Sequence, residues 1–188
     1  MNTPNNPAPS YTGVAKSLHW LMALLLLGLL ALGFYMSDLP LSPRKLQLYS
    51  WHKWAGVTVF LLVLIRLGWR LMHRPPALPA HMPPLLRMAA HAGHALLYVL
   101  MVAIPLSGWL MSSAKGFQTV WFGVLPIPDL LSKDPALGEL LQSVHFSLNL
   151  LFIAVLAGHV GAALKHHFID RDDILVRMLP AIGTETSP

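Results

Sequence analysis

The feature that most constrains this chain is Leu18–Met36, a run of 19 residues without a charged side chain. A helix rises about 1.5 Å per residue, so this run is long enough to cross a hydrocarbon layer about 30 Å thick. His19 is its one strongly polar member. A secretory leader has a shorter apolar run of about 7–15 residues and then a small-residue cleavage site. We therefore expect this segment to be retained as a membrane span.

Three further stretches have the length and polarity of spans. Trp51–Leu71 contains Lys53 and Arg66 near its two ends, from where long basic side chains can reach the head groups. The other two stretches are bounded by charged residues, Arg87 with Lys115 and Glu139 with Lys165. We expect helices at about 17–36, 51–71, 88–112 and 141–165. They predict one membrane domain over residues 1–188, an all-α, transmembrane antiparallel four-helix bundle.

The composition agrees with lipid and excludes several kinds of chemistry. Hydrophobic residues make up 55% of the chain and charged residues only 11%, whereas a soluble domain has about 25% charged residues. The absence of cysteine excludes disulfides, iron–sulfur clusters, thiolate zinc sites and Cys-x-x-Cys-His haem attachment. The net charge of +5 is not accompanied by a basic run or a basic, aromatic face, so we expect no nucleic-acid partner.

Basic residues are unequally divided between the two sides of the predicted bundle. Four spans place both termini on one side, and that side carries eight Lys and Arg residues: Lys16, Arg66, Arg70, Arg74, Arg87, Lys165, Arg171 and Arg177. The other side carries five: Arg44, Lys45, Lys53, Lys115 and Lys133. The positive-inside rule then predicts cytoplasmic termini in a bacterial inner membrane.

The ten histidines are the main chemical signal. His52 and His145 are expected at one depth, near the periplasmic ends of the second and fourth spans. His159 follows His145 by 14 residues, a rise of about 21 Å and nearly four whole turns, so both project from one face of the fourth span. At the cytoplasmic level, depth alone leaves three possible partners for His159: His19, His91 and His94.

Paired histidines on apolar helices fit one kind of metal centre best. Zinc usually takes three or four ligands and calcium takes oxygen ligands, while no acidic residue lies within a charge-free span. Haem iron needs two axial ligands, which two neutral imidazoles on neighbouring helices supply. The pattern therefore predicts two b-type haems at two depths. The alternative for each lone histidine is a structural hydrogen bond within the bundle.

Several motifs together resemble the prokaryotic cytochrome b561 family over about residues 11–180. They are Ser17-Leu18-His19-Trp20, Trp51-His52-Lys53 with Gly56, Gly93-His94 with Tyr98, His145 with His159, and Leu164-Lys165-His166-His167-Phe168-Ile169-Asp170 with Asp172-Asp173. The resemblance implies His19 and His159 as ligands of a haem near the cytoplasm, and His52 and His145 as ligands of a haem near the periplasm. It leaves His91 and His94 to hydrogen bonds within the bundle or to a propionate, or to the neighbourhood of a quinone.

The resemblance also implies an activity. Small free-standing members of this family are similar to superoxide:ubiquinone oxidoreductases, which take electrons from periplasmic superoxide and reduce ubiquinone. Other members are cytochrome b subunits that relay electrons from a periplasmic dehydrogenase or other protein donor to quinone. A third, less favoured interpretation is a non-redox transporter or scaffold with structural histidines. Membrane lipid is an expected partner in each case, and the sequence leaves a homo-oligomer open.

Other residues have candidate roles in such a reaction. Lys53, with Arg44, Lys45 and Lys115, is a candidate for steering superoxide, against the alternative of a solvated surface of mixed charge. His166 and His167 are candidate proton donors on the quinone side, or else a basic cluster that fixes topology. Arg66 and Arg70 share a helix face, so one of them is a candidate to bind a haem propionate, and lipid phosphate is the alternative.

Overall fold

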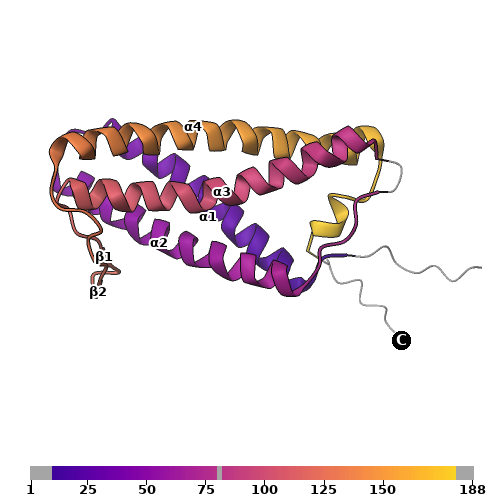
Figure 1. The fold of residues 1–188 in the computed structure, drawn as a ribbon, viewed down its shortest axis with the longest axis horizontal. Coiled ribbons are helices and arrows are strands. Elements are labelled where there is room, and N and C mark those ends of the chain that lie inside the picture. The colour runs from indigo at the N-terminus through magenta and orange to yellow at the C-terminus, as the bar shows by residue number, and fades with distance from the viewer. Residues whose placement is uncertain (1–9, 80–81, 181–188) are drawn as a thin grey trace, which may run out of the picture.

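The computed structural model describes residues 10–79 and 82–180, and four long helices dominate it. They are α1 (Gly13–Ser37), α2 (Pro43–Met72), α3 (Pro84–Ala114) and α4 (Pro135–Lys165). All four are long and apolar enough to cross a membrane. They run up and down along one axis, and the described ends of the chain lie at the same end of the molecule (Figure 1). The predicted all-α transmembrane four-helix bundle is confirmed.

The helices start earlier than their hydrophobicity predicts, because capping residues set the first turn. The Ser42 hydroxyl accepts from the Lys45 amide at 3.3 Å, and Pro43 occupies the first turn of α2. The Asp134 carboxylate accepts from the Leu137 amide at 3.0 Å in front of α4. Proline at the first helical position lacks an amide that would be unpaired there in any case. As a result α2 begins at 43 rather than about 51, and α4 at 135 rather than about 141.

The buried core lies in the middle of the bundle. Met22 of α1, Val59 and Val63 of α2, Leu100 of α3 and Phe152 of α4 are almost completely enclosed and form one cluster. Large apolar side chains also cover the outside, and Leu24 is 70% exposed. An apolar exterior around a small packed core is the pattern expected for helices surrounded by lipid.

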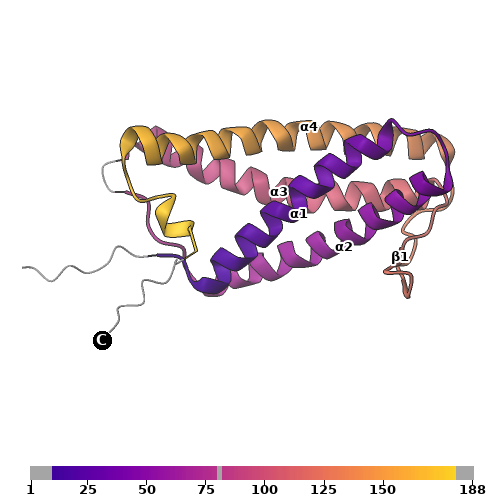
Figure 2. The ribbon, with the colours of Figure 1, turned by 180° about the vertical axis from the view of Figure 1, so that it is seen from behind.

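Helix pairing determines which side chains can meet. Helix α3 packs most extensively against α4, and α1 packs against α2. Seen from behind, α1 runs obliquely from the C-terminal end of α2 toward the N-terminal end of α4 (Figure 2). Helix α3 continues through Pro105 without ending. The start of α1 therefore lies near the C-terminal end of α2, and the end of α1 approaches the start of α4.

The connections close the two ends of the bundle. The α3–α4 connection contains a two-stranded antiparallel hairpin, β1 (Val120–Trp121) and β2 (Leu125–Pro126), which the sequence did not lead us to expect. The Trp54 indole of α2 donates to the Val120 carbonyl at 2.6 Å and holds this hairpin. At the opposite end the Trp20 indole donates to the Met178 carbonyl at 3.0 Å. The chain after α4 continues as a short π-helix, η1 (His166–Asp170), and a 3-10 turn, η2 (Val176–Met178).

Candidate functional site

The end of the bundle that carries the hairpin, hereafter the hairpin end, brings His52 and His145 together. The two rings project from α2 and α4, their centroids are 6.5 Å apart, and their planes are inclined by 78°. A metal–imidazole bond is about 2.0–2.1 Å long, so two imidazoles on opposite sides of one metal would have ring centres roughly 6 Å apart. The spacing of this pair therefore matches a two-ligand metal centre.

Hydrogen bonds define the tautomer of His145. Its Nδ1 lies 3.0 Å from the Ile104 carbonyl oxygen, which can only accept, so Nδ1 carries the hydrogen and donates it. The Ser107 hydroxyl donates to the same carbonyl at 2.7 Å, and its oxygen lies 3.0 Å from Nδ1. The other ring nitrogen, Nε2, therefore keeps its lone pair. A backbone acceptor on Nδ1 is the arrangement usually found around a metal-binding histidine.

His52 lacks a comparable partner. Its Nδ1 is buried without a hydrogen bond among the described residues. An isolated buried polar nitrogen is costly, so this position favours a role for the ring other than a structural hydrogen bond.

Two glycines make room for the imidazoles at this end. A Cβ atom on Gly33 of α1 would lie 3.4 Å from Cε1 of His52, and one on Gly108 of α3 would lie 3.1 Å from Cε1 of His145. Each ring is therefore packed closely against the backbone of a neighbouring helix. Both glycines are in ordinary helical positions, so their value here is the absent side chain rather than backbone freedom.

A cavity lies beside this pair. Its walls include both imidazoles and Gly56, and the remaining wall is mostly apolar: Leu26, Leu29, Leu30, Val59, Met101 and Phe152. An apolar cavity with two imidazoles and no carboxylate among its lining residues suits a flat, apolar macrocycle whose metal accepts two nitrogen ligands.

The opposite end of the bundle, hereafter the terminal end, gathers three histidines. The His159 ring centroid lies 6.3 Å from that of His19 and 5.3 Å from that of His94. Within residues 10–79 and 82–180 only His166, Asp170 and Asp172 bring three potential ligand atoms within 4.8 Å of one another. The three imidazoles thus do not form a compact three-ligand site, and the geometry leaves both His19 and His94 as partners for His159. His91, the third candidate, is exposed.

Arg66 is bound to this cluster. Its Nη2 lies 2.9 Å from Nδ1 of His19, and its Nε donates to the Tyr98 hydroxyl at 3.1 Å. A guanidinium can only donate, so Nδ1 of His19 accepts and the hydrogen of this ring is on Nε2. His19 and His145 therefore have opposite tautomers in this structure.

The other candidate residues lie as follows. The Arg70 guanidinium lies over the Tyr98 ring, 5.7 Å from the ring centroid. The residue that contacts His19 is Arg66 and not Arg70. Lys53 donates to the Phe117 carbonyl at 2.9 Å, in the connection that closes the hairpin end. His166 lies 2.6 Å from a carboxylate oxygen of Asp172, whereas His167 makes an edge contact with Phe168.

Sequence reasoning missed the groups that orient the rings. The Ile104 carbonyl has no signal in a sequence, because every residue has one. Gly33 and Gly108 have no motif that distinguishes them in the sequence from the other glycines of the spans. Only a predicted pairing of α1 with α2 and of α3 with α4 would have placed these glycines opposite histidines.

Four apolar helices that hold facing imidazoles at two levels define a class of protein, the helical membrane cytochromes that carry electrons. A family model described as prokaryotic cytochrome b561 matches residues 10–181. The chain belongs to this family of bacterial membrane electron-transfer proteins, which implies that it binds haem b. The resemblance inferred from the motifs is therefore confirmed.

Curated relatives agree along most of their length. Cytochrome b561 homolog 2 of Escherichia coli (strain K12) is 37% identical over 180 residues, which cover 95% of this chain and 93% of the relative. Cytochrome b561 homolog 1 of the same strain is 29% identical and covers 74% of this chain and 78% of the relative. A Yersinia pestis protein named probable superoxide oxidase CybB is 27% identical, with coverage of 90% and 96%.

The close packing of Gly108 leads to a first prediction. Gly108→Ala would place a methyl group 3.1 Å from the His145 ring, so the ring must move by a few tenths of an ångström and weaken its bond to Ile104. We expect a lower haem content per protein and an altered reduced spectrum. Gly28→Ala is the matched control, because no atom lies within 4 Å of its Cβ position. Equal haem content in both variants would show that the ring tolerates the methyl group.

Proposed function

We propose that this protein binds two b-type haems and uses them to oxidise periplasmic superoxide and reduce ubiquinone. The observation that carries the proposal is the pair of facing imidazoles at each of two levels of α4. The relative named probable superoxide oxidase CybB supports the choice of donor, at 27% identity. The balanced reaction converts two superoxide ions, one ubiquinone and two protons into two dioxygen molecules and one ubiquinol.

In this proposal His52 and His145 hold one haem at the hairpin end, and His19 and His159 hold the other at the terminal end. Haem b supplies one-electron chemistry when bound, and the protein tunes it through the axial imidazoles, burial and hydrogen bonds. We favour His19 over His94 because the family resemblance gives the ligand role to His19. The ring distances from His159, 6.3 Å to His19 and 5.3 Å to His94, do not by themselves decide between the two. His94 is then left to hydrogen bonding beside the same site.

Arg66 is the better candidate for a propionate. A histidine that binds metal through Nε2 carries its hydrogen on Nδ1, and such an Nδ1 cannot accept from Arg66. Ligation by His19 through Nε2 would therefore release the guanidinium from this contact. A guanidinium freed beside the site is suited to bind a carboxylate with two hydrogen bonds. Arg70, which does not reach His19, is less well placed for this role.

The proposed orientation puts both termini in the cytoplasm and the hairpin end in the periplasm of the inner membrane. It rests on the excess of basic residues at the terminal end, eight against five. Superoxide would then approach the hairpin end. Arg44, Lys45, Lys53 and Lys115 there bond to uncharged oxygen atoms, and no ion pair neutralises them among the residues described. The Asp129 carboxylate acts electrostatically on Lys53 without forming an ion pair with it, so this end keeps positive charge that is able to attract a small anion.

Quinone reduction consumes two protons, and His166 is the better of the two candidate donors. It follows His159 by seven residues, about two helical turns, so at the start of η1 it continues the side of α4 that carries His159, about 10 Å nearer the terminal end. Its Nδ1 is 2.6 Å from Asp172 and 3.2 Å from Asp170, while Asp170 also pairs with Lys165. The carboxylates hold the hydrogen on Nδ1, which leaves Nε2 to exchange a proton with a bound quinone.

The ligand assignment predicts a pairwise loss of haem. His52→Ala and His145→Ala should lose the same haem, and His19→Ala and His159→Ala should lose the other, because an iron with one remaining imidazole is held weakly. His91→Ala should keep both haems and serves as the control. Haem per protein from the pyridine adduct, with low-temperature spectra, measures this. Loss of a haem in His94→Ala but not in His19→Ala would reverse the choice between them.

The superoxide reaction is tested by stopped-flow mixing of the oxidised protein with superoxide. We expect rapid haem reduction that added ubiquinone reverses. Lys53→Glu should slow the first phase about three- to tenfold and weaken its dependence on salt, because an attractive charge has become repulsive. Lys133→Glu, exposed at the same end, is the matched control for charge.

One result would contradict the superoxide reaction, and another would contradict the steering role of Lys53. Haem that does not respond to superoxide would favour a protein donor, and stable co-purification with a dehydrogenase would support that alternative. Equal rates in wild type and Lys53→Glu would remove the steering role while leaving the reaction in place.

The proton-donor assignment predicts a difference between neighbouring histidines. His166→Ala should slow haem re-oxidation by ubiquinone by about a hundredfold, the lower end of the usual contribution of a positioned acid. Asp172→Asn should slow it less and should change its pH profile. His167→Ala and Asp173→Asn are the controls, since His167 contacts Phe168 and Asp173 pairs with Arg177. Full rates in both His166→Ala and Asp172→Asn would reject the role.

A further inference from the structure

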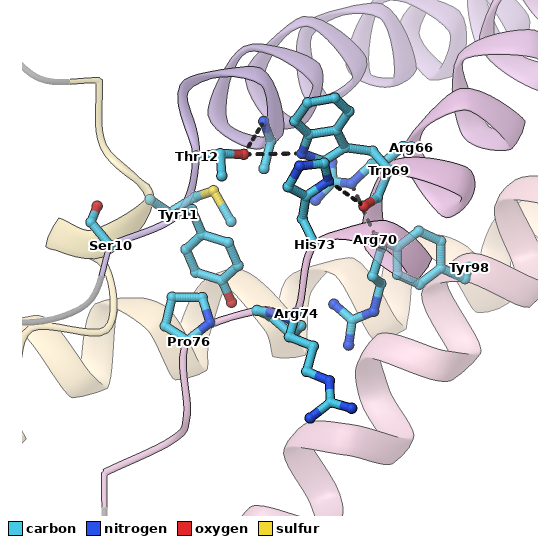
Figure 3. Close-up of a pocket in the computed structure, with 13 residues that line it drawn as sticks. Ser10, Tyr11, Thr12, Arg66, Trp69, Arg70, His73, Arg74, Pro76 and Tyr98 are labelled. Carbon is cyan, nitrogen blue, oxygen red and sulfur yellow. Dashed lines mark hydrogen bonds between the residues drawn. The ribbon is translucent and has the colours of Figure 1, made fainter.

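A second cavity opens at the terminal end beside the histidine cluster, and Arg66, one of its lining residues, is hydrogen-bonded to His19. The segment before α1, the end of α2 with the chain that follows it, and Tyr98 of α3 form its walls (Figure 3). The Trp69 indole donates to the Thr12 hydroxyl at 3.0 Å and joins two of these walls. The cavity is therefore formed between several segments of the chain and is not a gap beside a single loop.

Arginines dominate the chemistry of this cavity. Arg66 and Arg70 are four residues apart and share a face of α2, and Arg74 follows in the extended segment after α2 ends at Met72; all three line the cavity. None of them forms an ion pair with a carboxylate in the part of the chain that the structure describes. The cavity thus presents positive charge without an internal counterion.

The three arginines differ in what they already contact. Arg66 reaches inward to His19 and the Tyr98 hydroxyl. Arg70 rests over the Tyr98 ring, and Arg70 and Arg74 extend in the same direction, away from Trp69 (Figure 3). Both of these outer side chains are exposed. They are therefore available to an anion that enters from outside the bundle.

The position of the cavity indicates where that anion comes from. It lies where α1 begins at Gly13 and α2 ends at Met72, at one end of two helices that are long and apolar enough to cross a membrane. Leu71 and Met72, between the two outer arginines, are 86% and 72% exposed. A free phosphate would gain nothing from these apolar side chains, whereas the acyl chains of a lipid would pack on them.

We propose that this cavity binds the phosphate group of an anionic phospholipid. Arg70 and Arg74 bind the phosphate oxygens, and Leu71 and Met72 contact the acyl chains. Guanidinium groups bind phosphate through paired hydrogen bonds, and basic pockets between membrane helices hold the head groups of anionic lipids. This site is distinct from the inward-facing Arg66, which we assign to the haem propionate.

The test uses the full-length, haem-loaded protein and native mass spectrometry. The protein in mild detergent is mixed with phosphatidylglycerol or with phosphatidylcholine of the same acyl chains. Wild type should retain phosphatidylglycerol preferentially, and Arg70→Gln with Arg74→Gln should reduce that retention by about tenfold or more. The matched control, Lys16→Gln with Arg171→Gln, removes the same charge at the same end outside the cavity and should retain the lipid. Arg74→Gln alone, at a side chain without a described contact, should give a smaller loss if the double variant folds poorly.

Three results would overturn the proposal. Equal retention in the wild type, the double variant and the control would show only diffuse attraction to the membrane. Displacement of the lipid by millimolar inorganic phosphate would show a site for phosphate that does not depend on acyl chains. Unchanged lipid retention with a lower haem content in the double variant would assign these arginines to the haem instead.

Discussion

The arrangement of the paired histidines depends on one rigid element, helix α4, because α4 supplies an imidazole to both levels of the bundle. His145 and His159 are fixed relative to each other by 14 residues of helix, so any shift of α4 along the bundle moves both. The contact of His145 with the Ile104 carbonyl fixes the register of α4 on α3. Extensive packing between these two helices supports that register. The two proposed haem sites are therefore structurally coupled even though they lie at opposite ends.

The two levels are coupled but chemically unlike. At the hairpin end, His145 keeps a lone pair on Nε2 and its partner His52 has a buried Nδ1 without a hydrogen bond among the described residues. At the terminal end, Arg66 donates to His19 and a third imidazole adjoins His159. A guanidinium next to one site and apolar walls around the other would stabilise different charges. Such a difference is a general means by which a protein gives two chemically identical cofactors different potentials.

Much of the fold and of the candidate site could be predicted from the sequence, and the features that could not be predicted have physical causes that the sequence does not display. Charge-free runs predict spans, and the 14-residue spacing predicts two levels. The early starts of α2 at Pro43 and α4 at Pro135 were missed because caps, not hydropathy, set them. Depth alone leaves the partner of His159 open because depth does not define a helix face, and only the family resemblance assigns His19; the ring distances do not decide it. The Ile104 acceptor could not be predicted, since backbone carbonyls have no identity in a sequence.

The early helix starts have a consequence for which molecules can reach the hairpin end. His52 lies nine residues after Pro43 and His145 ten residues after Pro135, so both rings are roughly 13–15 Å below the tips of their helices. The β1–β2 hairpin, which is held by the Trp54 indole, lies at the same end of the bundle. The proposed electron entry point is therefore recessed, and a donor has to reach past the tips of α2 and α4 to approach it.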